Sequence, residues 1–248
     1  MIIDVHAHLG LDHTFDEDFR RADLEAKIAE HAVDVQIVQP GTCHTLDDAR
    51  AQHDAIAALC RERPGRFLGM ANPSPHLPPD AYRAEVRRCV VDLGFVALKL
   101  HPLAHGVRPS SRAGRLALEA ARAHGIPLMV HTGAGYPFAA PIEMLPLAHE
   151  FAEVPIILAH MGQVTYAGEA AAVLAACPNV YGDTSWSPGY LLADWVRRYG
   201  PRLLLGSDHA DNTATELAKI RTCGLAPAAQ DDILGGAAAR LFGLDRPA

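Results

Sequence analysis

Short apolar segments recur along the chain at an interval of about 29 residues, close to the length of one strand with its connecting helix. Each segment spans seven to nine residues, is rich in Val, Ile and Leu, and is nearly continuous in apolarity. Such runs are typical of parallel strands that are buried on both faces. The eight segments are Ile2–Leu9, Asp34–Pro40, Arg66–Asn72, Phe95–Leu103, Pro127–Gly133, Pro155–Gly162, Asn179–Ser185 and Arg202–His209.

Segments with helical periodicity separate these runs and follow the last of them. They are Asp18–His31, Asp47–Arg61, Pro79–Asp92, Arg112–His124, Pro141–Phe151, Gly168–Ala176, Tyr190–Tyr199, Ala214–Arg221 and a terminal helix over Pro227–Phe242. Eight alternating units predict an α/β fold whose parallel sheet closes into a (β/α)8 TIM barrel. The alternative, an open doubly wound sheet, lacks the glycine-rich loop of a nucleotide site. No linker-like stretch divides the 248 residues, so we expect a single domain over residues 1–248.

Composition argues against several other classes of protein. The net charge of -7 disfavours a nucleic-acid surface, and no apolar run approaches the ~18 residues of a membrane span. The start of the chain lacks the charged region of a secretory signal. Five cysteines without a CxxC pair indicate reduced thiols. We therefore expect a cytoplasmic protein that acts on a small-molecule substrate, without nucleic-acid or membrane partners; the sequence leaves homo-oligomerisation open.

The first predicted strand carries polar residues where a buried strand should be apolar. Asp4, His6 and His8 stand at alternate positions, so we expect them to share one face of the strand. The opposite face then carries Ile3, Val5, Ala7 and Leu9. Because residues two apart on a strand are separated by roughly 6.5–7 Å, two inward imidazoles can reach one metal ion.

Later strands carry further polar residues at the ends where they leave the barrel, which is where barrels place their active sites. These are Lys99 and His101 on the fourth strand, His131 on the fifth, His160 on the sixth and Asp208 on the eighth. Each alone has a structural explanation, such as a hydrogen-bonded histidine, a helix-capping aspartate or a salt-bridged lysine. Together they predict a metal site. Imidazole and carboxylate donors without thiols favour Zn²⁺, with Mn²⁺ or Fe²⁺ as alternatives.

These residues give the chain a resemblance to the amidohydrolase superfamily, in particular to its branch of metal-dependent hydrolases like aminocarboxymuconate-semialdehyde decarboxylase. The segments that carry the resemblance are Ile3–Leu9, Pro64–Phe67, Gly94–Pro102, Val130–Gly133, Leu158–Gly162 and Leu205–Asp208. The resemblance implies a distorted (β/α)8 barrel and a divalent metal.

The resemblance also implies two sets of ligands. A one-metal site would use His6, His8, His131 and Asp208, with His160 beside them as a supporting or catalytic residue. In a two-metal site a carboxylated Lys99 would bridge both ions: His6, His8, Lys99 and Asp208 would bind one, and Lys99, His131 and His160 the other. We expect one ion, with Lys99 positioning an anionic substrate.

The expected function is metal-dependent hydrolysis of a small molecule, namely a lactone, amide or ester that carries a carboxylate. Asp208 would accept the proton of a metal-activated water, and His160 or Lys99 would stabilise the developing oxyanion. An alternative keeps the site and makes the protein a nonoxidative decarboxylase of an aromatic or muconate-type acid. A metal-dependent deoxyribonuclease is disfavoured by the acidic charge. An alternative of another class is a non-catalytic metal-binding barrel.

Loops after the strands would determine specificity. Candidate substrate contacts in these loops are His13, His44, His105, Arg108, Tyr136, Trp186 and His209.

Overall fold

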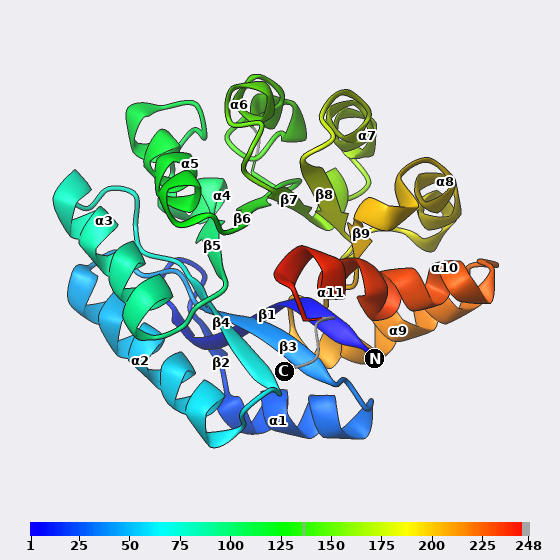
Figure 1. Cartoon of the computed structure of the whole chain (residues 1–248), viewed down its shortest axis with the longest axis horizontal. Helices are drawn as coiled ribbons and strands as arrows, with labels where there is room; N and C mark the ends of the chain where they lie inside the picture. The colour runs from blue at the N-terminus through cyan, green and yellow to red at the C-terminus, as the bar shows by residue number, and fades with distance from the viewer. Residues whose placement is uncertain (136, 245–248) are drawn as a thin grey trace.

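The computed structural model describes residues 1–135 and 137–244. Nine strands of these residues form one sheet in the order β2-β1-β3-β4-β5-β6-β7-β8-β9 (Figure 1). Their bounds are β1 Ile3–Asp12, β2 Glu17–Phe19, β3 Val35–Pro40, β4 Phe67–Ala71, β5 Ala97–Leu100, β6 Leu128–His131, β7 Ile156–Ala159, β8 Val180–Asp183 and β9 Leu203–Leu204. Each strand from β3 to β9 is parallel to the one before it in this order, and β2 pairs with β1 antiparallel.

The sheet closes into a barrel where the segment after β9 meets β1. Val5 N donates to Leu205 O at 2.9 Å, and Asp208 N donates to His6 O at 2.7 Å. Ala7 and Asp208 form a parallel bridge just beyond β9. These bonds join the β9 side of the sheet to β1, which confirms the predicted TIM-barrel architecture.

Helices surround the barrel, as Figure 1 shows. Their bounds are α1 Arg21–Glu30, α2 Leu46–Glu62, α3 Pro79–Arg87, α4 Pro102–His105, α5 Arg112–His124, α6 Leu145–Glu150, α7 Ala167–Ala176, α8 Gly189–Tyr199, α9 Thr213–Thr222, α10 Pro227–Asp231 and α11 Ala237–Phe242. Each helix predicted from periodicity is present; α5 has the predicted bounds, and the others have shifted ends. Within the described ranges, no helix has the length and apolarity needed to cross a bilayer.

Two apolar layers explain why the strands read as continuous apolar runs. Inside the barrel, residues such as Ile37, Met129 and Leu204 pack together, and Ala238 of α11 packs against them. Outside it, residues such as Leu98 on β5 pack in the layer beneath the helices. A strand that is buried on both faces has few positions where a polar side chain is tolerated, so its polar residues are informative.

A β-bulge in β1 changes which face of the strand its residues occupy, in contrast to the prediction. The register of β1 against β3 shifts between Asp4 and Ala7. Before the shift, Val5 packs inside the barrel, whereas after it Ala7 packs in the outer layer. One extra residue in a strand reverses which face its side chains occupy. His6 therefore faces inward, as does His8 beyond it, while Asp4 does not share their face.

Asp4 instead links β1 to β3 and to the segment after β9. It accepts from Gln36 Nε2 at 2.8 Å on β3, and from Ser207 Oγ at 2.6 Å after β9. Both partners are buried, and so is Asp4. Asp4 thus stabilises the contact between β1 and the segment after β9, next to His6.

Two segments between the barrel strands also differ from their predictions. Residues 10–12 of β1 pair with Glu17–Phe19 in a hairpin, so that α1 begins at Arg21 and not at the predicted Asp18. The predicted fourth strand ends at Leu100 and not at Leu103. The chain turns there into the short helix α4, because Pro102 has the fixed φ that suits the first position of a helix.

Candidate metal centre

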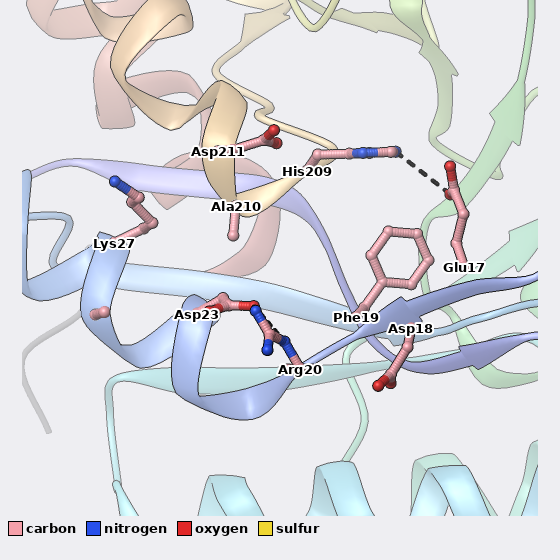
Figure 2. A pocket seen from close by; sticks show the side chains of 10 residues that line it. Glu17, Asp18, Phe19, Arg20, Asp23, Lys27, His209, Ala210 and Asp211 are labelled. Atoms are coloured by element: carbon pink, nitrogen blue, oxygen red, sulfur yellow. Dashed lines mark hydrogen bonds and ion pairs between the residues drawn. The ribbon is translucent and has the colours of Figure 1, made fainter.

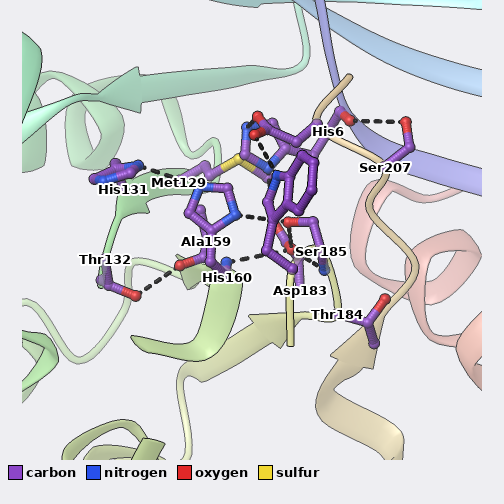
Figure 3. A network of polar contacts seen from close by, with 12 residues as sticks. His6, Met129, His131, Thr132, Ala159, His160, Asp183, Thr184, Ser185 and Ser207 are labelled. Atoms are coloured by element: carbon purple, nitrogen blue, oxygen red, sulfur yellow. Dashed lines mark hydrogen bonds and ion pairs between the residues drawn. The ribbon is translucent and has the colours of Figure 1, made fainter. Parts of the chain in front are cut away.

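Polar side chains from five barrel segments converge at one site. Figure 3 shows His6, His131 and His160 of this group, with Asp183 and Ser185 beside them. His6 and His8 come from β1, Lys99 comes from β5, and His131 is the last residue of β6. His160 follows β7 directly, and Asp208 lies in the segment after β9. The fold therefore brings together all six residues that the sequence singled out as ligands or catalytic groups.

Three of these residues form a compact buried cluster. One side-chain ligand atom from each of His6, His160 and Asp208 lies within 4.8 Å of the others. His6 and His160 are at most 2% exposed. Such a set of two imidazoles and a carboxylate matches the donor types that zinc and similar divalent ions bind.

The hydrogen bond to Asp183 places the proton of His6 on Nδ1 and its lone pair on Nε2. Its Nδ1 lies 2.7 Å from Oδ2 of Asp183, so this nitrogen carries the proton and donates to the carboxylate. The deprotonated Nε2 then faces Asp208 Oδ1 at 3.0 Å, which is also an acceptor. Lys99 Nζ donates to the same Nε2 at 2.9 Å.

Hydrogen bonds also determine which nitrogens of His131 and His160 carry the proton. His131 donates from Nε2 to Ala134 O at 3.0 Å, which leaves its Nδ1 as an acceptor. Ser185 Oγ donates to Asp183, so His160 Nδ1 donates to Ser185 Oγ at 2.8 Å and its Nε2 is an acceptor. These two acceptors, His131 Nδ1 and His160 Nε2, lie 3.1 Å apart. Lone pairs that face each other at this distance are stabilised by a cation, so the donor set fits a metal ion.

Electrostatics favour the neutral, metal-binding form of His8, His131 and His160. Burial lowers the pKa of His8 and of His160 to about 4, and it lowers the pKa of His131 well below the ordinary value. Burial and Lys99 oppose protonation of His6, but Asp208 and Asp183 outweigh them and raise its pKa.

Asp208 and Lys99 are the charged groups of the centre. Burial alone would raise the pKa of Asp208, but His6 and His160 outweigh it and hold the pKa well below its usual range. Burial lowers the pKa of Lys99 to about 8. The centre thus combines neutral nitrogen donors with an ionised carboxylate and a buried amine.

His8 occupies the outer side of the same carboxylate. Its Nε2 lies 3.1 Å from Asp208 Oδ1 and 2.9 Å from Gln39 Nε2. Its Nδ1 is buried and has no hydrogen-bond partner among the residues that the structure describes. His8 therefore has an unsatisfied ring nitrogen beside the cluster.

Sequence reasoning missed three supporting residues. Asp183 ends β8 and bonds His6, Ser185 bonds His160, and Gln39 of β3 bonds His8. A rule that singles out any polar residue near the end of a buried strand, and not only His, Lys and Asp next to an apolar run, would have found Asp183 and Gln39.

A cavity of about 220 Å³ opens onto the cluster. Its lining includes His8, Lys99, His101, His131, His160 and Asp208, together with Phe15, Phe19 and His209. The His101 ring stacks on His131 with ring centres 4.1 Å apart, and the Phe19 ring stacks on His8 at 4.8 Å. Flat rings and a small volume fit a compact planar substrate.

A larger cavity of about 480 Å³ lies next to the first. The two share Glu17, Phe19 and His209 in their linings, and Figure 2 shows the larger one with His209 facing Glu17. Phe19 and His209 meet edge to face with ring centres 5.2 Å apart. The β2 hairpin and the segment after β9 thus form a common wall of both cavities.

Some of the predicted substrate contacts lie at the cavity or the metal centre, and others do not. His209 lines the cavity, and Trp186 Nε1 donates to Asp208 Oδ2 at 2.8 Å. Arg108 pairs with Glu143 at 3.2 Å, and His44 bonds Thr14. His13 is exposed, His105 is buried in α4, and Tyr136 lies outside the described residues.

Comparisons with known proteins bear on the family and the fold of the chain. The family model described as Amidohydrolase matches residues 3–244. A stretch of 51 residues is 49% identical to gamma-resorcylate decarboxylase from Rhodococcus jostii, and it spans 21% of this chain but only 15% of that relative.

Solved structures resemble the whole described fold. That of 2,6-dihydroxybenzoate decarboxylase from Rhizobium has a TM-score of 0.79 at 19% identity, with 99% of both chains covered. A dihydroxybenzoic acid decarboxylase from Polaromonas, solved with manganese and the inhibitor 2-nitroresorcinol, has a TM-score of 0.79 at 18% identity. That match covers 99% of this chain and 98% of the other. At such identities the likeness concerns the fold.

Proposed function

Because the chain belongs to the amidohydrolase family, we propose that it is a metal-dependent enzyme that removes the carboxyl group of a small aromatic acid without oxidation. The sequence placed hydrolysis first and decarboxylation second. The similarity to decarboxylases, in a local stretch of sequence and in overall fold, supports the second reading. The small cavity lined by flat rings is consistent with an aromatic substrate.

The environment of Asp208 is the observation that carries this choice. Hydrolysis requires this carboxylate to accept a proton from water, whereas decarboxylation requires only that it help to hold a cation. Its Oδ1 faces His6 and His8, and its Oδ2 already accepts the indole N–H of Trp186. A carboxylate with both oxygens engaged is a poor proton shuttle and a good ligand.

We assign the metal to His6, His8, His131, His160 and Asp208, as one divalent ion. Manganese in the Polaromonas structure supports Mn²⁺ as a candidate beside Zn²⁺ and Fe²⁺. When bound, such an ion supplies positive charge that holds acidic oxygens of the substrate and stabilises negative charge.

The chain's own groups complete the reaction. The bond between the ring carbon and the carboxyl carbon breaks, its electron pair stays on the ring, and CO₂ leaves. The ring carbon then takes up one proton. Lys99 lines the cavity and carries exchangeable protons on Nζ, so we assign it the delivery of this proton. His101 and His131 stack beside it and provide a flat wall against which the ring can lie.

The test follows the atoms that enter the product. The full chain is loaded with Mn²⁺ and incubated with hydroxybenzoic acids in D₂O, and separately in ¹⁸O-labelled water. We expect CO₂ release, one deuterium on the ring carbon that lost the carboxyl group, and no ¹⁸O in the aromatic product. Lys99→Met should retain Mn²⁺ and lose roughly 10²–10⁴-fold in rate, the usual contribution of a general acid.

Two other outcomes would reject the proposal. Incorporation of ¹⁸O from water into the product of a lactone, amide or ester would restore the hydrolase. A metal-loaded protein that is inert with acids, lactones, amides and esters alike would support the non-catalytic barrel.

A further inference from the structure

The loop that follows β8 contacts two residues of the metal centre. We call residues 184–188 the β8 loop. Within it, Ser185 Oγ lies 2.8 Å from His160 Nδ1, and Ser187 Oγ donates to His160 O at 2.9 Å. Trp186 Nε1 donates to Asp208 Oδ2 at 2.8 Å. The position of this loop therefore affects how His160 and Asp208 are oriented.

The β8 loop adopts a conformation that needs outside support. Trp186 has a φ of +57°, in the left-handed region that residues with a Cβ rarely adopt. The residue is 45% exposed, so burial does little to fix its position. Something other than local preference must hold the indole against Asp208.

Two residues of α9 provide that support. Lys219 Nζ donates to Thr184 O at 2.6 Å and to Ser187 O at 2.8 Å, one near each end of the loop. Glu216 Oε1 accepts from Trp186 N at 3.0 Å, in the middle of the loop. Glu216 and Lys219 pair with each other at 2.5 Å, and Glu216 is only 2% exposed.

We propose that the Glu216–Lys219 pair is a positioning device for the metal centre, which acts through the β8 loop. The pair holds the loop so that the Trp186 N–H occupies Oδ2 of Asp208, and Oδ1 stays turned toward the nitrogens of His6 and His8. Trp186, Glu216 and Lys219 are thus positioning residues. The inference rests on the proposed metal site and not on which reaction takes place there.

The bonding pattern favours this role over plain stabilisation of α9. Leu217 and Ile220 already bury the apolar side of that helix. A buried ion pair is weak evidence for stability, because removing two charges from water offsets much of their attraction. Here both partners bond the backbone of the β8 loop, so the pair fixes the position of that loop.

The experiment measures Mn²⁺ affinity of the metal-free full-length protein by titration calorimetry, without any substrate. Trp186→Phe keeps an aromatic ring and removes the indole N–H. Lys219→Met removes the ammonium group that donates to Thr184 O and Ser187 O. Burial raises the pKa of Glu216 to about 7, so without Lys219 it can protonate and need not remain an unpaired charge. We expect each variant to bind Mn²⁺ roughly 10- to 100-fold more weakly, as when an outer partner of a metal ligand is lost.

The double variant and the conservative variant separate positioning from general loss of stability. If the pair acts through Trp186, Trp186→Phe with Lys219→Met weakens Mn²⁺ binding no more than the worse single change. Lys219→Arg, which keeps the charge and donors, should restore most of the affinity.

Two control variants lie on α8. Trp195→Phe changes the chain's other tryptophan, and Arg197→Met removes an exposed pair of the same spacing with Asp194, at 2.8 Å. Both should bind Mn²⁺ like the unmodified protein.

Wild-type affinity in Trp186→Phe, or additive losses in the double variant, would overturn the inference. Because Trp186 is half exposed, its variant tests the proposal even if Lys219→Met fails to fold. A wild-type protein that binds no Mn²⁺ would overturn both this inference and the metal site. Coupled losses of affinity in a protein that decarboxylates nothing would reject only the proposed reaction.

Discussion

Asp183 determines which nitrogen of His6 faces the metal position. It is fully buried and accepts from His6 Nδ1 at 2.7 Å and from Ser185 N at 2.8 Å. Burial alone would raise its pKa, but His6 and the hydrogen bonds outweigh burial and lower the pKa to about 2. Asp183 is therefore an ionised acceptor, which keeps the His6 proton on Nδ1 and the lone pair on Nε2.

Replacing Asp183 by asparagine tests this role at the scale of one atom. The amide keeps the shape of the side chain but can turn its NH₂ toward Nδ1, which would move the His6 proton to Nε2. We expect Mn²⁺ affinity of the metal-free protein to fall roughly 10- to 100-fold in calorimetry.

The control is Asp194→Asn, which makes the same change on the exposed side of α8 and should leave the affinity unaltered. An Asp183→Asn variant that folds and binds Mn²⁺ with wild-type affinity would show that the Asp183 carboxylate does not govern His6.

At the scale of the element, β1 shows where prediction from sequence stops. Its apolar run was visible in the sequence, and so was the position of His6 and His8. The bulge was not visible, because residues on either side of it alternate with the same period. The histidines face inward as predicted, but Asp4 belongs to a different network.

Other elements were hidden for different physical reasons. β2 consists of Glu17, Asp18 and Phe19, which is too short and too charged to read as a strand. Its pairing depends on the hairpin geometry of β1. The contact of Trp186 with Asp208 joins two strand-exit segments, and a local pattern contains no information about it. The positions of polar residues at strand ends predicted which side chains meet. Only the folded structure shows which of their atoms face each other.

The contact between α2 and α3 predicts a pH dependence of stability away from the metal centre. His53 of α2 donates from Nδ1 to Glu85 of α3 at 2.8 Å, and both side chains are fully buried. Arg88 adds a second partner to Glu85 at 2.7 Å. Burial alone would raise the pKa of Glu85, but His53 and Arg88 outweigh it and hold the pKa well below the ordinary 4.5.

Because its pKa is lower in the folded state, the Glu85 carboxylate stabilises the fold above pH 4.5, and this contribution is lost as the pH falls further. Glu85→Gln should lower the free energy of unfolding by about 1.5–3 kcal/mol at pH 7, the size of a hydrogen bond to a charged group. The deficit should shrink in urea titrations carried out at progressively lower pH. A deficit that is independent of pH would mean that shape, and not charge, matters at this position.

At the scale of the whole molecule, the metal centre lies where the barrel closes. β1 supplies His6 and His8, and the segment after β9 supplies Asp208, so ligands from opposite ends of the sequence meet across the closure. Backbone bonds hold this closure, such as that from Asp208 N to His6 O at 2.7 Å. An ion bound by these side chains would hold the first and last barrel strands together, so metal binding and folding should be linked.

This linkage makes the melting temperature a measure of metal binding. Mn²⁺ at about 100 times its dissociation constant adds about 2.7 kcal/mol to the stability of a protein that binds it only when folded. For a domain of this size that corresponds to a rise of roughly 5–10 °C, seen by calorimetry after chelation and stepwise addition of Mn²⁺. Asp208→Asn keeps the shape of the ligand but not its charge, and should lose most of the rise, whereas Arg197→Met on α8 should keep it. An equal rise in Asp208→Asn would place the stabilising ion elsewhere, since the closure of this barrel would then gain nothing from the carboxylate.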